Sequence, residues 1–130
     1  LHCTANGKAM LAAMEDALLS QLKKRMHLTA FTENSIQSWE KLEQELRRIR
    51  ETGIAFDREE HSIGISAIGT AIIGFEGEIA AITIPTPTVR FIKKEPELAK
   101  ALKRCREAVD RILGGSPARR HLPGSVAEQP

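Results

Sequence analysis

The sequence predicts one mixed α/β domain in which a β-sheet is flanked by helices, and three features indicate it. Bulky and small side chains alternate with a period of two across residues 53–85, which is typical of strands. Before and after that region, apolar residues recur at helical spacing opposite charged faces. The chain of 130 residues is long enough for one domain with a buried core.

The alternation also separates the two faces of the expected sheet. One set of bulky residues lies at even-numbered positions, and a set of small residues lies at odd-numbered positions together with one carboxylate, Asp57. The bulky face needs a helix packed on it, unless a bulge at Gly64 or Gly69 breaks the phase. The small face leaves room for either a closely packed helix or a cleft, and we favour a cleft that binds a small molecule beside Asp57. The bulky positions are Ile54, Phe56, Ile68, Ile72, Ile82 and Ile84, and the small ones are Ala55, Ala67, Gly69, Ala71, Ala81 and Thr83.

The composition narrows the class of protein. A hydrophobic fraction of 42% and a charged fraction of 28% are those of an ordinary globular domain, and no apolar run is long enough to cross a membrane. A net charge of +2 is too small to indicate binding to nucleic acid or to an anionic membrane. The two cysteines are too few for a disulfide framework and fit a reducing cytoplasm. The chain begins with Leu, and we expect it to be a fragment.

Residues 1–26 predict either one bent helix or two short ones. Thr4 is a favourable N-cap, and Glu15 can begin a second helix. At the first helix start, unpaired backbone N–H groups can face an anion, and Ala5 and Asn6 are small enough for a ligand to approach. A plain cap with a tight packing contact is the alternative, and spacing alone favours it. The apolar positions are Leu11, Met14, Leu18 and Leu22.

Residues 27–53 predict a loop and then an amphipathic helix that ends at Gly53. Thr32, Asn34 and Ser35 are the candidate caps for its start. We expect Trp39 to lie in the core or at an oligomer interface rather than to stack on a ligand, because it belongs to the apolar stripe. That stripe comprises Ile36, Trp39, Leu42, Leu46 and Ile49.

The polar segment after Asp57 contains Glu59, Glu60 and His61, a combination that could hold a metal or perform acid–base chemistry. Neighbouring carboxylates on a turn are usually solvated, and a lone His has no second ligand at a defined spacing. We therefore expect a solvated turn, with no metal and no cofactor. Further along, the Glu76–Gly77 pair lies between two apolar runs and predicts a hairpin turn.

Residues 86–113 predict a proline-broken loop and then a final helix, which Gly114 ends. We expect Cys105 to be a buried, inert thiol, because it lies on the apolar stripe of this helix. Residues 114–130 are rich in Pro, Gly, Ser and charge, and we expect a flexible C-terminal tail. The stripe comprises Leu98, Ala101, Leu102, Cys105, Val109, Ile112 and Leu113.

Five segments together carry a resemblance to a known family. They read HCTANGKAMLAAM from residue 2, FTENSI from residue 31, LEQELRRIRETG from residue 42, IAFDREEHSIGISAIGTAI from residue 54 and EIAAITIP from residue 78. In that order and spacing they resemble the effector-binding domain of IclR-family bacterial transcription regulators, over residues 2–114. The combination of TANGKAMLA, GIAFDREE and G-x-x-A is fairly specific.

The resemblance implies an α/β (α+β) fold with an antiparallel sheet and flanking helices, related to the GAF and PAS sensor domains. It implies a small organic effector in a cleft above that sheet, and assembly into dimers or tetramers. DNA would be bound by a separate winged helix-turn-helix domain that precedes this one. We expect that domain and the first strands of the effector domain to precede residue 1, outside this sequence. We therefore expect residues 1–113 to sense a ligand without binding DNA specifically.

Three pocket positions of the family fall on residues of this sequence that fit the proposed chemistry. The resemblance places the amides that would hold an effector carboxylate on Ala5 and Asn6, and the pocket aspartate on Asp57. An ionised Asp57 would repel the effector carboxylate, so it should face a hydroxyl or amine of the ligand. Alternatively, burial raises its pKa and it shares a proton with the ligand.

Three further pocket positions depart from the family pattern. Ala67 replaces a polar cysteine of glyoxylate- or pyruvate-responsive members, and Thr83 and Pro85 replace two serines. The missing thiol and hydroxyl argue against a short keto acid. We expect instead a small hydroxylated or aromatic carboxylate, bound without chemistry.

Two other functions stay open. A thiol enzyme would use Cys3, whose place near a helix start favours a thiolate, with His2 or His61 as base. No recognisable arrangement of nucleophile, base and orienting group supports that reading. A ligand-free oligomerisation module would simply pack a helix on the small face of the sheet. We place both below the sensor.

Overall fold

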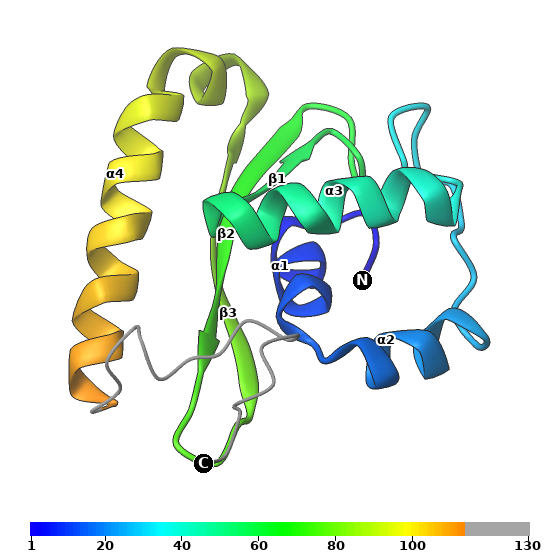
Figure 1. Ribbon diagram of the computed structural model, residues 1–130. Coiled ribbons are helices and arrows are strands. Elements are labelled where there is room, and N and C mark those ends of the chain that lie inside the picture. Colours follow the sequence, from blue (N-terminus) through cyan, green and yellow to red (C-terminus); the bar gives the residue numbers. More distant parts are fainter. Residues whose placement is uncertain (114–130) are drawn as a thin grey trace, which may run out of the picture.

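The computed structural model describes residues 1–113, which form a three-stranded antiparallel sheet with helices on both faces (Figure 1). The predicted α/β fold with an antiparallel sheet is confirmed. The expected tail, residues 114–130, lies outside the described residues. The elements in chain order are α1 (Ala5–Ala13), α2 (Asp16–Lys23), α3 (Trp39–Thr52), β1 (Ala55–Arg58), β2 (Ile65–Ile73), β3 (Ile79–Pro87) and α4 (Thr88–Ile112).

The register of the sheet places the bulky residues named above on one face and the small ones on the other, although Ile65, Ile73 and Ile79 also lie on the small face near its ends. The strand order is β1-β2-β3, and both pairs match even-numbered residues with even and odd with odd. Ile68 pairs with Phe56 and Ile84, whereas Gly69 pairs with Ala55 and Thr83. Directly opposed residues share a face, so no bulge disturbs the phase.

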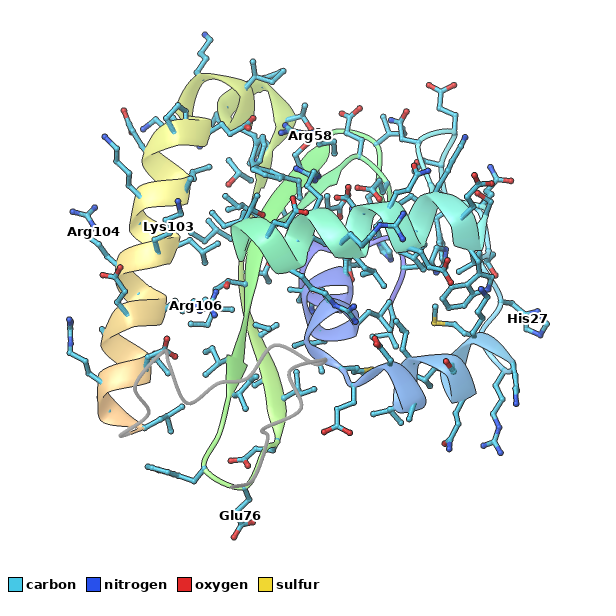
Figure 2. All side chains as sticks on the ribbon, in the orientation of Figure 1. His27, Arg58, Glu76, Lys103, Arg104 and Arg106 are labelled. Atoms are coloured by element: carbon cyan, nitrogen blue, oxygen red, sulfur yellow. The ribbon has the colours of Figure 1, made fainter. Side chains whose placement is uncertain are left out.

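The bulky face is covered by α4, as expected. Its core cluster consists of four buried residues, with partly buried neighbours from the strands and from α4. Figure 2 shows Arg106 pointing from α4 toward the sheet, where its Nη1 donates to Thr70 Oγ1 at 3.2 Å. Thr70 Oγ1 in turn donates to the Gly53 carbonyl at 2.7 Å. The cluster residues are Ile54, Ile68, Phe91 and Leu102.

The small face is covered by α1, and α3 packs on the other side of α1 (Figure 1). A Cβ added to Gly69 would lie 3.1 Å from the carbonyl carbon of Ala5 and 3.2 Å from the amide nitrogen of Asn6. The closely packed helix that was the alternative to a cleft is therefore present at Gly69. The second core cluster joins these layers and consists of Ala9, Leu11, Ala12, Leu42, Leu46, Ile49 and Ala55.

The first segment forms two short helices rather than one bent helix. Thr4 caps α1 as predicted, because its Oγ1 accepts from the Gly7 amide at 3.1 Å. The chain leaves the helical conformation at Met14 and begins α2 after Glu15. Arg50 of α3 closes the end of α1 by donating to the Ala12 carbonyl at 2.8 Å.

The start of α3 differs from the prediction. Ser38 is the N-cap and accepts from the Lys41 amide at 3.3 Å, so Thr32, Asn34 and Ser35 were the wrong candidates. Ser35 instead closes a tight turn upstream of α3, where its Oγ accepts from the amides of Phe31 and Thr32. Such local side-chain bonds compete with helix formation and delay the helix start.

The C-terminal end of α3 and the turn of the β2–β3 hairpin agree with the prediction. Gly53 has the left-handed conformation, with φ 76°, that commonly ends a helix. Gly77 also has a positive φ, 86°, in the turn between β2 and β3. No helix within residues 1–113 is long and apolar enough to span a membrane.

The last segment corrects two expectations. No proline-broken loop follows residue 86, because β3 continues to Pro87 and α4 begins at Thr88 and contains Pro96. Cys105 is exposed rather than buried. C-terminal to Leu102, Arg106 and Asp110 form the surface of α4 that faces the sheet, and Arg106 Nε lies 3.8 Å from Asp110 Oδ2. Cys105 therefore points outward.

Candidate functional site

Asp57 occupies a buried position at the end of β1. Its side chain is 5% exposed, and Oδ1 accepts a hydrogen bond from the Glu60 amide at 2.8 Å. Burial raises the pKa of this carboxyl, while the Glu60 and His61 amides and the nearby Lys8 ammonium act in the opposite direction. A carboxyl with a raised pKa can donate as well as accept a hydrogen bond, depending on pH.

The start of α1 lies on the same face of the sheet. The first intrahelical hydrogen bond runs from the Lys8 amide to the Thr4 carbonyl at 3.0 Å, so the amides of Ala5 and Asn6 come before it. Ala5 is buried and Asn6 is exposed. Both contact Gly69, whose missing side chain permits the close approach.

The remaining predicted residues lie in two adjacent rows of this face. Ala67 is buried and pairs with both Asp57 and Pro85. In the next row, Thr83 pairs with Gly69, and its Oγ1 donates to the Ile68 carbonyl at 3.1 Å. Thr83 and Pro85 are exposed. Rows on one face are about 7 Å apart, so the six predicted positions lie close together over the central rows of the small face.

Lys8 is a residue of this region that the sequence analysis missed. Its side chain is 1% exposed, and Nζ lies 2.8 and 2.9 Å from the two Glu60 carboxylate oxygens. Glu45 Oε1 of α3 lies 3.4 Å from the same nitrogen. The signal was available, since Lys8 precedes buried Leu11 by three residues and so shares its face of the helix.

The prediction that Glu60 is solvated is wrong. The side chain is buried because the Lys8 ammonium provides a compensating charge inside the protein. Burial raises the pKa of Glu60, and Lys8 lowers it.

The neighbouring polar residues do not form a metal site. His61 is exposed, and its ring stacks on Phe31 with the centroids 5.2 Å apart. Glu59 Oε1 accepts from the Gly64 amide at 2.8 Å and supports the local turn. Within residues 1–113, no group of three or more His, Cys, Asp or Glu side chains is placed to bind a metal ion.

The environment of Cys3 does not favour a nucleophilic thiolate. The thiol is buried, and burial raises its pKa, with Asp57 and Glu60 acting in the same direction. A catalytic thiolate requires the opposite shift. His2 Nε2 lies 2.8 Å from the Thr29 carbonyl oxygen, so this ring is bonded to the backbone.

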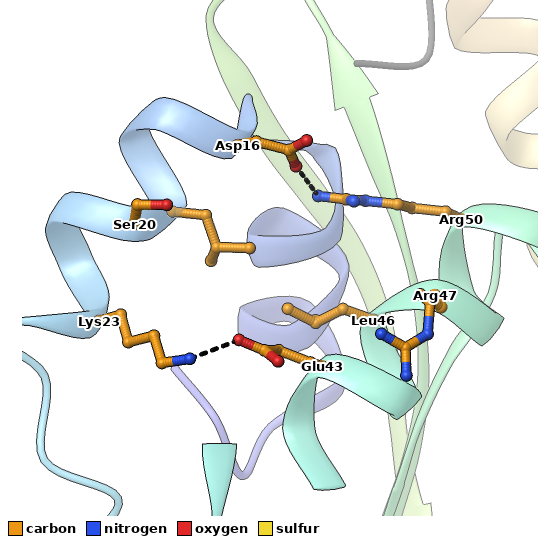
Figure 3. A pocket seen from close by; sticks show the side chains of 8 residues that line it. Asp16, Ser20, Lys23, Glu43, Leu46, Arg47 and Arg50 are labelled. Carbon is orange, nitrogen blue, oxygen red and sulfur yellow. Dashed lines mark hydrogen bonds and ion pairs between the residues drawn. The ribbon is translucent and has the colours of Figure 1, made fainter. Parts of the chain in front are cut away.

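A separate hollow of about 270 Å³ lies between α2 and α3 (Figure 3). Leu19 and Leu46 contribute apolar surface to its lining. Ion pairs link the two helices across it, from Lys23 to Glu43 at 2.7 Å and from Arg50 to Asp16 at 3.3 Å. This hollow contains none of the predicted site residues, and nothing in the periodicity of the sequence indicated it.

Known proteins are similar to this chain in both sequence and fold. The family described as bacterial transcriptional regulator IclR C-terminal matches residues 1–111. The chain is 40% identical over 121 residues to the HTH-type transcriptional regulator Rv1719 of Mycobacterium tuberculosis, covering 92% of this chain and 46% of that protein. It is 32% identical over 118 residues to the DNA-binding transcriptional repressor YiaJ of Escherichia coli, covering 88% and 42%.

A solved structure agrees with these relatives. The crystal structure of IclR from Thermotoga maritima superimposes with a TM-score of 0.81 at 34% identity, covering 88% of this chain and 47% of that one. The α+β fold is therefore that of the effector-binding domains of bacterial transcription regulators. The chain belongs to the IclR family, whose members matched here are transcriptional regulators and not enzymes. It spans about half the length of the curated relatives it matches.

Proposed function

We propose that residues 1–113 are the ligand-sensing domain of an IclR-type regulator, which binds a small organic acid and passes its occupancy to a separate DNA-binding domain. The observation that carries this proposal is the buried Asp57 carboxylate, on the same small-residue face as the start of α1. Membership of a family of transcriptional regulators supports it.

The chemistry of the site suggests how such a ligand would be held. The amides of Ala5 and Asn6 would donate to a ligand carboxylate, since a helix start favours negative charge. Asp57 would face a hydroxyl or amine, or share a proton through its raised pKa. Ala67 and Thr83 would contact the middle of the ligand, with Pro85 beside them. A small hydroxylated or aromatic carboxylate satisfies these requirements.

The remaining parts of the proposal concern the assembly. We propose that the domain forms a homodimer or homotetramer in the cytoplasm and reaches DNA only through a domain outside this chain. Large apolar side chains on the surface support an assembly, among them Val89 and Ile92 of α4, which are 74% and 69% exposed.

A thermal-shift screen of small organic acids tests the ligand proposal, because a compound that binds only the folded state raises the unfolding temperature. Matched primary alcohols and amides that lack the carboxylate are the controls, and they should give no shift. Asp57→Ala should weaken binding of a hit by at least about 1 kcal/mol, or roughly fivefold, in calorimetric titration. A smaller loss would mean that Asp57 does not contact the ligand.

A second candidate is a ligand-free oligomerisation module, and the contact of α1 with Gly69 favours it. In this case the small side chains allow α1 to pack closely on the sheet and leave no space for a ligand. No compound would stabilise the protein, and the oligomer would persist when Asp57 is replaced. Sedimentation equilibrium of the parent chain and of Asp57→Ala, with the thermal-shift screen, separates the two candidates.

A further inference from the structure

One lysine is almost fully enclosed beside the proposed site. The Lys8 ammonium contacts both carboxylate oxygens of Glu60 at 2.8 and 2.9 Å and Glu45 Oε1 at 3.4 Å. Burying such a pair costs desolvation free energy, and well-packed hydrophobic residues of similar size often serve stability as well or better. Packing alone therefore does not explain why a charged pair occupies this place.

Glu60 links the lysine directly to the turn that carries Asp57. The Glu60 amide donates to Asp57 Oδ1 at 2.8 Å, and Glu60 Oε2 accepts from the Arg58 amide at 3.3 Å. Ser35 Oγ, from the segment before α3, donates to the Glu60 carbonyl at 2.6 Å. Both the backbone and the side chain of Glu60 are held, so the position of Asp57 depends on where Glu60 is anchored.

We propose that Lys8 is the positioning residue of the candidate site. Through Glu60 it holds the Asp57 turn against α1, and through Glu45 it ties that turn to α3. The part of this inference that concerns ligand binding rests on the proposed function. The effect of Lys8 on Asp57 itself does not, and it can be measured without any ligand.

The charges around Asp57 determine the direction of the expected effects. Burial raises the pKa of both Asp57 and Glu60, and the Lys8 ammonium lowers both. Removing the ammonium should therefore raise the Asp57 pKa. Removing the Glu60 charge should lower it, since two nearby carboxylates disfavour each other's ionisation. The titratable groups around Asp57 are Cys3 before α1, Lys8 on α1, and Glu60 and His61 after β1. Glu45 on α3 faces the Lys8 ammonium.

Carboxyl ¹³C NMR titration of the whole chain measures these shifts, with the Asp57 signal assigned by its loss in Asp57→Asn. Lys8→Met is expected to raise the Asp57 pKa by about one unit, the lower end for loss of a nearby opposite charge. Glu60→Gln, which keeps an oxygen acceptor for Lys8, is expected to lower it. Arg48→Met is the control, because Arg48 is an exposed cation that also pairs with Glu45, and it should leave the Asp57 pKa unchanged.

The two variants keep the inference testable even if one fails to fold. Circular dichroism identifies a Lys8→Met chain that does not fold, and Glu60→Gln then decides, since a pKa that does not fall overturns the proposal. An Asp57 pKa that Arg48→Met moves as far as Lys8→Met also overturns it. If no organic acid stabilises the parent chain, the sensor function fails, while the NMR titration still tests Lys8. With a ligand in hand, Lys8→Met should lose affinity that Arg48→Met retains.

Discussion

Gly69 shows how the absence of one side chain brings a helix start to the centre of a sheet. It lies in the middle of β2, where it pairs with Ala55 and Thr83, and the backbone of Ala5 and Asn6 lies directly over it. The atoms that a Cβ would meet belong mostly to backbone, which cannot rotate away as a flexible side chain does. The distance between α1 and the sheet therefore depends on this glycine.

Gly69→Ala should lower the free energy of unfolding by about 1–3 kcal/mol, because the added methyl group forces α1 away from the sheet. Urea unfolding followed by circular dichroism measures the change. Ala80→Ser, which adds one atom at an exposed position of β3, is the control and should have little effect. An equal loss in both variants would show that the approach of α1 is not tight.

The buried carboxyls predict how stability depends on pH. Asp57 and Glu60 have pKa values raised above the ordinary range, so their contribution to stability is complete at acidic pH and is lost as pH rises through the raised values. Glu45 and Glu95 have lowered pKa values, so their contribution is lost as pH falls through the lowered values. The combined contribution of these four carboxyls to stability should therefore be greatest near the ordinary carboxyl range, at about pH 4–5.

Asp57→Asn should flatten the fall in stability as pH rises above the ordinary carboxyl range, because asparagine keeps an acceptor for the Glu60 amide without a titrating charge. Urea midpoints across this pH range measure the slope. Glu76→Gln, at the exposed tip of the β2–β3 hairpin (Figure 2), is the control. A variant slope as steep as that of the parent chain would show that Asp57 does not titrate in this window.

At the scale of elements, a single hydroxyl joins three parts of the fold. Thr70 of β2 donates to the Gly53 carbonyl at the end of α3 and accepts from Arg106 of α4. Polar atoms inside a protein are costly when they have no partner, so this junction fixes how α4 lies on the bulky face. The bond from Arg106 to Thr70 also explains why the surface of α4 that faces the sheet becomes polar C-terminal to Leu102.

Thr70→Val should cost about 1–3 kcal/mol of stability, because the shape is kept while Gly53 and Arg106 each lose a hydrogen-bond partner. Chemical denaturation measures the loss. Thr86→Val on β3 is the matched control, since no side-chain hydrogen bond of Thr86 is found among residues 1–113. Similar costs at the two positions would mean that the Thr70 junction contributes little.

Local patterns predicted some element boundaries well and others poorly. Thr4 and Gly53 were assigned correctly, because a cap and a left-handed glycine act within a few residues. Ser35 has the same chemistry as the true cap, Ser38, but its hydroxyl donates a hydrogen bond to the backbone carbonyl of distant Glu60. Cys105 fits an apolar stripe, yet the contacts of Arg106 and Asp110 decide which side of α4 faces the sheet.

At the scale of the whole molecule, the proposed function requires communication with another domain. Coupling between an effector and DNA is reciprocal, so a ligand that changes operator affinity must have its own affinity changed by the same factor. The chain covers 46% of Rv1719 and 42% of YiaJ, so a measurement of the coupling between effector and DNA requires the full-length regulator.

In the full-length regulator, ligand affinity should differ with and without operator DNA, by about 5–150-fold for a typical coupling free energy. Calorimetric titration of the ligand in both states measures the factor. The Asp57→Ala regulator, titrated in parallel with operator alone, should retain its operator affinity while losing the response to ligand. Identical ligand affinities in the two states would reject the coupling.

Side-chain alternation and helical spacing were sufficient to establish the α/β class, the register parity of the sheet and the helix on its bulky face, and the order of five sequence segments carried the family resemblance. These patterns are local, because a strand or helix repeats within a few residues and the phase survives without knowledge of the fold. The burial of Lys8 with Glu60 and Glu45, the seating of α1 on Gly69 and the outward turn of Cys105 became visible only in three dimensions. Each depends on segments far apart in the chain, and a charge or a cavity is favourable or costly only according to what those segments place beside it.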